Sequence, residues 1–356
     1  MKIRAFEAFS VDLPLREGYR IANQTISFAR NMLVRVESDE DVIGLGSAAP
    51  ANNEGGESDE SCLAALNGPL RELALGAEFS SDPSPLADEA LRVAADFPAA
   101  RAALDMALWD LAARKAGVSL VRFWGGEPKP LPTSVTIGVC SVEETLAAAQ
   151  DWLAQGFRIL KVKIGEDVEL DTERLRKMRK LIGPDVALRV DGNQGYSLED
   201  ARTLLRATDD LDLEMLEQPL NARDLDSMCA LRGESRVPII ADEAAGTIEE
   251  CAEIVDRGAA HGINIKLMKC GGPSAARTIH DRAHAAGFSL MLGCNDETRV
   301  SIAAAVHLAL AMPGLKYADL DGHMDLVRDP ASGGFEISDG CLHVGETAGL
   351  GVEVAL

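Results

Sequence analysis

The 356-residue sequence contains no uninterrupted apolar run of about 18 residues, which excludes a transmembrane helix. It is also poor in basic residues, because 35 Lys and Arg stand against 57 Asp and Glu and the net charge is −22. A field of that sign repels phosphate backbones and argues against nucleic-acid partners. The hydrophobic fraction of 47% is that of an ordinary globular protein, and the length suits two to three domain-sized units.

Two further absences concern disulfides and targeting. The seven cysteines are scattered without a C-x-x-C pair, and an odd, unclustered set favours free thiols in a reducing compartment. The N-terminal segment MKIRAFEAFSVDLPL alternates apolar and polar residues and lacks the continuous apolar core of a signal peptide. We therefore expect a cytoplasmic protein.

Residues 1 to about 50 have the pattern of a strand meander. The strand-like segments are IRAFEAFSVDL, ARNMLVRVES and VIGLGSAAP, and the glycine-containing segment REGYRIANQTIS predicts a polar loop between the first two. From about residue 60 to 118 apolar residues recur at helical spacing, and a long alanine-rich helix is expected to end at Gly117. A meander followed by helices predicts an α+β unit over residues 1–125.

Beyond residue 126 strand-like runs alternate with segments of helical pattern. Runs rich in Val and Ile suit a buried parallel sheet, and eight such units predict an α/β fold with a (β/α)8-type (TIM-like) barrel over residues 126–328. A doubly wound sheet is the alternative, but no Gly-rich phosphate loop follows the first strand. The short strand-like segment 329–356 is expected to return to the first domain. The eight runs are TSVTIG, ILKVKI, VALRVD, LEMLE, PIIAD, GINIK, SLMLG and LKYADLD.

Carboxylates end three successive strands of this predicted barrel, at Asp191, Glu217 and Asp242. The carboxyl ends of the strands form the active-site face of such a barrel. Three converging carboxylates repel one another unless a cation lies between them, and oxygen donors without His or Cys suit Mg²⁺. The alternative is that each carboxylate caps the helix that follows its strand. We predict a magnesium site.

Lysine is rare, with ten residues against twenty-five arginines, yet Lys161, Lys163 and Lys266 fall on predicted barrel strands. Lys161 and Lys163 are two residues apart and share one face of a strand. Lys266 lies on a later strand, at about the opposite wall of a closed barrel. Lysines buried near a metal and near one another are expected to have lowered pKa values and to act as bases. Lysines reaching solvent from an edge strand are the alternative, although a closed barrel has no edge.

Together these residues predict one class of reaction. A carboxylate substrate bound to Mg²⁺ loses its α-proton, and the metal stabilises the enediolate that forms. Lysines on opposite faces remove the proton from one side and return it to the other, so the product is the epimer. If one lysine is redundant, the same site supports a β-elimination or a cycloisomerisation.

Five motifs on the predicted strands carry these residues: KVKIG (161–165), RVDGNQGYS (189–197), LEQPL (216–220), IIADE (239–243) and NIKLMKCGG (264–272). They resemble the motifs of the enolase superfamily, in its mandelate racemase/muconate-lactonizing-enzyme subgroup, over essentially the whole chain. The resemblance implies a capping domain like residues 1–125 and a C-terminal return to it. It further implies that Asp191, Glu217 and Asp242 are the metal ligands. Lys163 and Lys266 would be the acid/base pair, with Lys161 as an electrostatic helper. Asn193 would be the asparagine of the site.

The eighth strand points to one group within the superfamily. It ends in Asp319-Leu320-Asp321, which resembles the D-x-D signature of dipeptide epimerases. Spacing of two aims both carboxylates at the same space, where they would bind the α-ammonium of a dipeptide. The alternative is that they cap the following turn. The seventh-strand segment GCNDE (293–297) lacks the histidine of mandelate-racemase-like members.

Other positions bear on the substrate. The segment that contains Thr136 and the loop at Glu297 are similar to those of dipeptide epimerases, so both residues are predicted to bind substrate. Ala-Glu epimerases tend to place an arginine in the capping loop for the substrate's side-chain carboxylate. Here Gln24 aligns with that arginine and Arg20 lies nearby, which leaves the preferred side chain open.

The leading hypothesis is a Mg²⁺-dependent dipeptide epimerase, an isomerase acting on a small-molecule carboxylate. N-acylamino acid racemase, o-succinylbenzoate synthase and muconate cycloisomerase are alternatives with similar lysines and ligands, but an N-acyl substrate has no ammonium for the eighth-strand acids. A metal-free Schiff-base lyase on the same fold would use a lysine as nucleophile, and EDTA would not inhibit it. We expect a homo-oligomer, because such barrels commonly associate.

Overall fold

The computed structural model describes residues 1–22, 24–50, 56–79 and 81–355. Its N-terminal part is an antiparallel meander of three strands, β1 (Ile3–Ile21), β2 (Gln24–Ser38) and β3 (Ile43–Ala48). The polar loop predicted between the first two strands was wrong, because β1 and β2 continue through it as a hairpin in which Tyr19 pairs with Ile26. A register shift after Pro14 absorbs the irregularity, so ladder hydrogen bonds resume beyond it.

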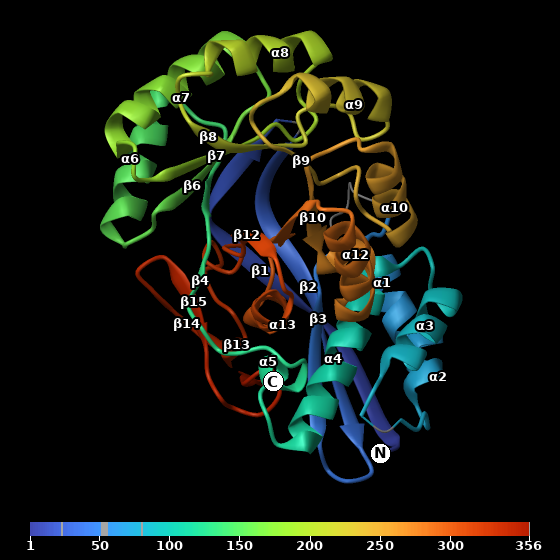
Figure 1. The fold of residues 1–356 in the computed structure, drawn as a ribbon. Coiled ribbons are helices and arrows are strands. Elements are labelled where there is room, and N and C mark those ends of the chain that lie inside the picture. Colours follow the sequence, from blue (N-terminus) through green and yellow to red (C-terminus); the bar gives the residue numbers. More distant parts are fainter. Residues whose placement is uncertain (23, 51–55, 80, 356) are drawn as a thin grey trace.

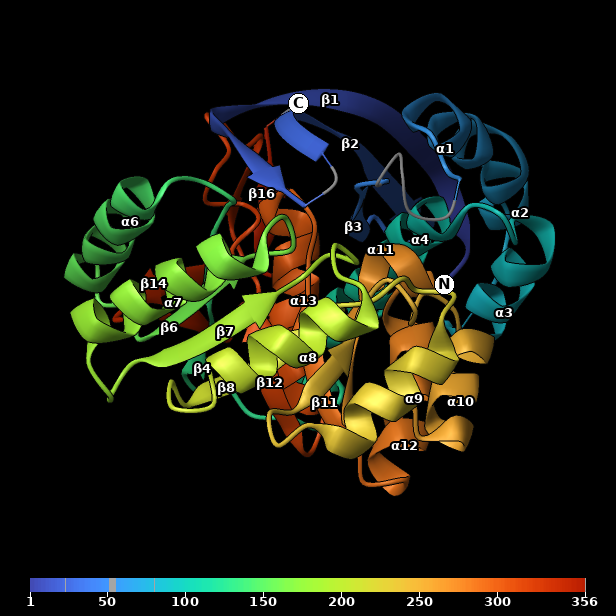
Figure 2. The same ribbon diagram turned by 90° about the horizontal axis from the view of Figure 1, so that it is seen from above.

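The far end of this hairpin reaches the barrel (Figures 1 and 2). The backbone N–H of Val139, in the loop after the first barrel strand, donates to the carbonyl of Arg20 at 2.7 Å. The amide of Asn31 likewise donates to the carbonyl of Asp296 at 3.0 Å. The N-terminal sheet therefore contributes side chains to the mouth of the barrel.

Helices pack against one side of the N-terminal sheet, and α4 lies closest to β3. Gly44 and Gly46 permit this contact, because a Cβ at Gly46 would lie 1.9 Å from the carbonyl oxygen of Ala103. The α4 helix ends where expected, at Gly117 in the left-handed region (φ 70°). The helical elements of this part are α1 (Asp59–Ala65), the π-helical segment η1 (Leu66–Leu70), α2 (Arg71–Ala74), α3 (Ser84–Val93), α4 (Pro98–Ala116) and α5 (Leu120–Phe123).

Eight parallel strands then follow one another around a sheet in chain order, which confirms the barrel. A doubly wound sheet would reverse its strand order, and this one does not. The N–H of Ser134, just before the first strand, donates to the carbonyl of Ala318 in the last at 3.1 Å, so the two edges meet. The strands are β5 (Val135–Ile137), β6 (Ile159–Lys163), β7 (Ala187–Asp191), β8 (Leu213–Glu217), β9 (Ile239–Ala241), β10 (Gly262–Lys266), β11 (Ser289–Gly293) and β12 (Leu315–Asp319).

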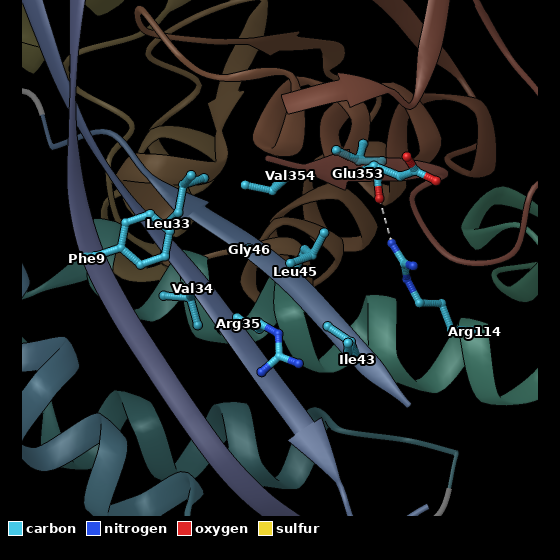
Figure 3. A pocket seen from close by; sticks show the side chains of 11 residues that line it. Phe9, Leu33, Val34, Arg35, Ile43, Leu45, Gly46, Arg114, Glu353 and Val354 are labelled. Atoms are coloured by element: carbon cyan, nitrogen blue, oxygen red, sulfur yellow. Dashed lines mark hydrogen bonds between the residues drawn. The ribbon is translucent and has the colours of Figure 1, made fainter. Parts of the chain in front are cut away.

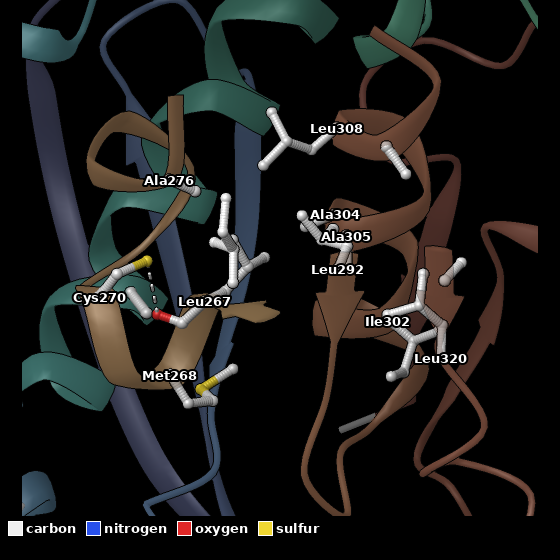
Figure 4. Close-up of a cluster of buried hydrophobic side chains, with 14 of the residues drawn as sticks. Leu267, Met268, Cys270, Ala276, Leu292, Ile302, Ala304, Ala305, Leu308 and Leu320 are labelled. Carbon is white, nitrogen blue, oxygen red and sulfur yellow. Dashed lines mark hydrogen bonds between the residues drawn. The ribbon is translucent and has the colours of Figure 1, made fainter. Parts of the chain in front are cut away.

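Helices surround this sheet, and several begin at capping boxes, such as those of Ser141 and Thr247. The last of them, α13, is almost wholly buried because it lies between the barrel and the N-terminal part (Figure 1). Figure 4 shows Leu292 of β11 among side chains of α13 and the short helix α11. The helices are α6 (Val142–Ala154), α7 (Val168–Ile182), α8 (Leu198–Ala207), α9 (Leu225–Glu234), α10 (Ile248–Arg257), α11 (Leu267–Cys270), α12 (Pro273–Ala285) and α13 (Arg299–Ala311).

The C-terminal segment turns back to the N-terminal part. The N–H of Leu350 donates to Asp110 of α4 at 2.7 Å, and Arg114 donates to the carbonyl of Val352 at 2.9 Å. A cavity of about 330 Å³ separates the last strand from the outer face of β2 and β3 (Figure 3). None of the helices in the described ranges is long and apolar enough to span a bilayer. The remaining strands are β4 (Leu131–Pro132), β13 (Ala331–Gly333), β14 (Phe335–Ser338), β15 (Cys341–Val344) and β16 (Val352–Val354).

Candidate active site

A cavity of about 1,630 Å³ opens between the β1–β2 hairpin and the carboxyl ends of the barrel strands. It lies on the face where such barrels place their active sites. The cavity is polar because charged side chains from both parts of the chain line it. Among the residues expected from the sequence, its lining includes Arg20, Thr136, Lys161, Lys163, Asn193, Lys266, Asp319 and Asp321.

The three predicted metal ligands lie side by side at the strand ends. Asp191 pairs in register with Glu217 across β7 and β8, and Glu217 pairs with Ile240, two residues before Asp242. All three side chains are fully buried. The strand-end pattern seen in the sequence therefore does bring these carboxylates together.

Lys161 lies at the centre of this group of acids. Its Nζ is 2.9 Å from Asp191 Oδ2, 2.8 Å from Glu217 Oε2 and 2.7 Å from Asp319 Oδ2. Burial alone would lower the pKa of Lys161, but these carboxylates outweigh it and hold the pKa well above its usual value. The expectation of a lowered pKa is wrong for Lys161, because the charges of three surrounding carboxylates outweigh its burial.

Lys163 shares Asp191 with Lys161, whereas Lys266 contacts a different carboxylate. Lys163 Nζ lies 2.8 Å from Asp191 Oδ2, and Lys266 Nζ lies 3.0 Å from Asp242 Oδ2. Their strands, β6 and β10, are separated by three others in the sheet of eight, so the two ammonium groups project from opposite walls. Each is largely buried yet lines the cavity.

Residues outside the predicted set hold the carboxylates in place. Asn264 Nδ2 donates to Glu217 Oε1 at 2.7 Å, and the ammonium of Lys269 donates to Asp242. Sequence reasoning missed both, although signals were present. Asn264 precedes Lys266 by two residues and so shares its strand face, and Lys269 follows Lys266 within one helical turn.

The donor chemistry of the three carboxylates fits a hard divalent cation. They offer only oxygen atoms, as Mg²⁺ prefers. Burial and the charge of Asp191 raise the pKa of Glu217 to about 7, whereas neighbouring lysines outweigh burial and lower the pKa values of Asp191 and Asp242. No three acidic, histidine or cysteine side chains of the described chain already converge on one point, because lysine ammonium groups lie between the carboxylates. Asp191, Glu217 and Asp242 are the residues that would hold Mg²⁺.

Replacing Asn264 by alanine should weaken Mg²⁺ binding by about 10- to 100-fold, a typical effect of removing a hydrogen bond to a ligand. The physical reason is that Glu217 loses the donor that orients its Oε1. Isothermal titration calorimetry with Mg²⁺ measures this effect, and thermal unfolding checks that the fold survives. Asn264→Ser retains a short donor and should lose less. Unchanged affinity in the alanine variant would contradict this role.

The two acids of the D-x-D segment differ in their surroundings. Asp319, the last residue of β12, accepts from Ser134 Oγ at 2.6 Å and contacts Lys161. Asp321 lies beyond the strand, and its Oδ2 accepts from the N–H of Thr136 at 2.6 Å. Burial, followed by the charges of Asp319 and Asp325, raises the pKa of Asp321 to about 7. Both line the cavity, but only Asp319 is ion-paired to a lysine.

The remaining predicted residues fall in different places. Asn193 donates to Glu243 Oε1 at 3.2 Å, and its backbone N–H donates to Asp191. Arg20 forms an ion pair with Glu166 at the mouth. Gln24 begins β2, and its side chain lies outside the described part of the chain.

Glu297 differs from expectation. Its side chain is buried, and its Oε1 accepts from the N–H of Asn295 at 2.8 Å, within its own loop. The neighbouring Asp296 lines the cavity instead. The β11–α13 loop does not follow strand alternation, so the sequence could not tell which of the two acids faces the site.

Comparisons with known proteins identify the family of the chain. Residues 4–125 match the model described as the mandelate racemase/muconate lactonizing enzyme N-terminal domain, and residues 144–355 match the one described as enolase C-terminal domain-like. An L-Lys-D/L-Arg epimerase of Methylococcus capsulatus is 44% identical over 353 residues, 99% of each chain.

Solved structures extend the comparison. A dipeptide epimerase of Methylococcus capsulatus, complexed with Mg and L-Arg-D-Lys, is similar with a TM-score of 0.95, 43% identity and full coverage of both chains. A substrate-liganded L-Ala-D/L-Glu epimerase of Bacillus subtilis has a TM-score of 0.97, 33% identity and full coverage of both. With both halves matched, and with lysines and carboxylates at the same barrel face, the chain belongs to the mandelate racemase/muconate lactonizing enzyme family of the enolase superfamily.

Proposed function

We propose that this protein is a Mg²⁺-dependent dipeptide epimerase, which removes the α-proton of the carboxyl-terminal residue and returns it on the opposite face. The observation that carries the proposal is the placement of Lys163 and Lys266 on opposite walls of one cavity, each beside a different strand-end carboxylate. Full-length relatives with 33–44% identity are dipeptide epimerases, two of them in structures holding Mg and a dipeptide.

The lysines carry the proton in this proposal. One neutral amine accepts the α-proton from its side, and the ammonium on the opposite wall donates a proton to the other side. The α-carbon is planar in the intermediate, so it can be protonated on the face opposite to the one that lost the proton. The product is then the epimer. Lys161, which is held charged among three carboxylates, is suited to stabilise negative charge on the substrate and not to act as a base.

Asp191, Glu217 and Asp242 would hold the cation. Mg²⁺ bound there would supply positive charge to stabilise the negative charge that develops on the substrate carboxylate. Asn264 and Lys269 keep Glu217 and Asp242 in position. At the far side of the cavity, Asp321 is the acid suited to the substrate's α-ammonium, because Asp319 is already paired with Lys161.

Incubation with Mg²⁺ and a dipeptide library in D₂O, followed by mass spectrometry, tests the proposal directly. We expect α-deuteration of dipeptides, its loss in EDTA and its recovery on adding Mg²⁺. Glu217→Gln should lower turnover by at least about 10²-fold, comparable to losing one transition-state electrostatic contact. Full activity in metal-free buffer, or borohydride trapping of a substrate adduct, would instead support the Schiff-base alternative. The cytoplasmic location and the homo-oligomer stay predictions of the sequence.

A further inference from the structure

We infer that Asp296 selects dipeptides whose carboxyl-terminal residue carries a cationic side chain. The inference rests on the proposed function and names the substrate class of the same site. The family alone does not decide this point, because relatives that are 33–44% identical are named for Lys and Arg, for hydrophobic residues, and for Glu.

Asp296 lies close to where the chemistry is expected. It follows β11 and lines the same cavity as Lys163 and Lys266. Burial raises the pKa of Asp296 to about 6, and the Tyr19 hydrogen bond and the charges of Lys163 and Lys266 act in the opposite direction. Because Asp296 and the two lysines line one cavity, its carboxylate can meet a substrate that is bound between them.

Of the substituents on the reacting α-carbon, only the side chain has no other group of the site assigned to it, so we assign it to Asp296. The α-proton points to a lysine, and the carboxylate points to the acids at the ends of β7, β8 and β9. The peptide nitrogen leads toward Asp321 beyond β12, where the amino end is expected. The β11 loop and the capping hairpin bound what remains of the cavity, and there Tyr19 of β1 meets Asp296.

The local charge at this position favours a cation. Tyr19 donates its hydroxyl to Asp296 Oδ2 at 3.0 Å, which fixes the carboxylate without neutralising it. No basic side chain of the described ranges lies within ion-pair distance of Asp296, and its Oδ1 has no donor there. Arg20, the cation that would receive an acidic side chain, is already paired with Glu166. An ammonium or guanidinium can therefore pair with Asp296, whereas a second carboxylate meets repulsion.

Three dipeptides with a common amino-terminal residue test this inference: L-Ala-L-Lys, L-Ala-L-norleucine and L-Ala-L-Glu. We expect kcat/KM for the lysine substrate to exceed that for its norleucine isostere by about 30-fold, as for a charged hydrogen bond. Asp296→Asn keeps an acceptor for Tyr19, and should lower the lysine value by about 10- to 100-fold while leaving norleucine within about threefold.

Asp151→Asn is the matched control, because Asp151 is an exposed acid on α6 that lines the same cavity and takes no part in the proposed site. This variant should keep kcat/KM for all three dipeptides within about threefold of the unsubstituted enzyme, because solvent and salt screen an exposed charge. A wild-type preference for norleucine or glutamate overturns the inference, as does an equal loss on all substrates in Asp296→Asn, or an equal effect of the control. Absence of α-proton exchange on all three substrates overturns the proposed function itself, and the inference with it.

Discussion

Lys163→Ala and Lys266→Ala should each stop epimerisation. We expect the epimerisation rate to fall by about 10²- to 10⁴-fold or more, the range for removing a general acid or base. Each variant should nevertheless exchange the α-proton of one epimer with solvent, because the lysine on the other wall is intact. The exchangeable epimer should differ between the two variants. Deuterium incorporation into separated L,L and L,D dipeptides, followed by mass spectrometry, measures both effects.

The opposite placement of β6 and β10 is the physical reason for this expectation. A base approaches a planar carbon from one side only, so each lysine serves one configuration. Lys177→Ala is a suitable control, since Lys177 is exposed on α7 and pairs with Glu173 outside the cavity. Exchange of the same epimer by both variants would mean that the two lysines share a face, and the proposed geometry would then be wrong.

Acetylation of the substrate's amino group should reduce kcat/KM by about 30- to several-thousand-fold. The acetyl group removes the ammonium and leaves the half-buried Asp321 without its partner, a penalty of roughly 2–5 kcal/mol for a desolvated pair. Each 1.4 kcal/mol is about tenfold in rate. Steady-state kinetics on a free dipeptide and its N-acetyl form gives the ratio.

Asp321→Asn should bring the two kcat/KM values closer together, chiefly by lowering kcat/KM for the free dipeptide. Asparagine can still accept from Thr136 N–H, so the loop is expected to keep its conformation. Asp319→Asn is less informative, because Asp319 also contacts Lys161 and Ser134. A preference for N-acetyl or N-succinyl amino acids would move the protein to the acylamino acid racemase alternative and leave the metal and lysine roles unchanged.

Sequence reasoning placed the strand-end residues well, because two local rules determine them. Side chains alternate along a strand, which puts Lys161 and Lys163 on one face, and parallel strands end at one edge, which gathers Asp191 and Glu217. The same reasoning failed at the first hairpin, where polar residues look like a loop but continue the ladder as far as Ile21. Polarity there reflects exposure at the cavity mouth and not the absence of a strand.

Within the sequence, motif resemblance indicated the family, while periodicity and backbone geometry determined the barrel and placed lysines and carboxylates at its strand ends. Only the tertiary structure decided which charges pair. It placed Lys161 among three carboxylates, which raises the pKa of a lysine expected to have a low one. It also turned Asp296 toward the cavity and buried Glu297, by packing a loop against Tyr19, 277 residues away in the chain. Such contacts depend on how distant segments pack, and no local pattern encodes them.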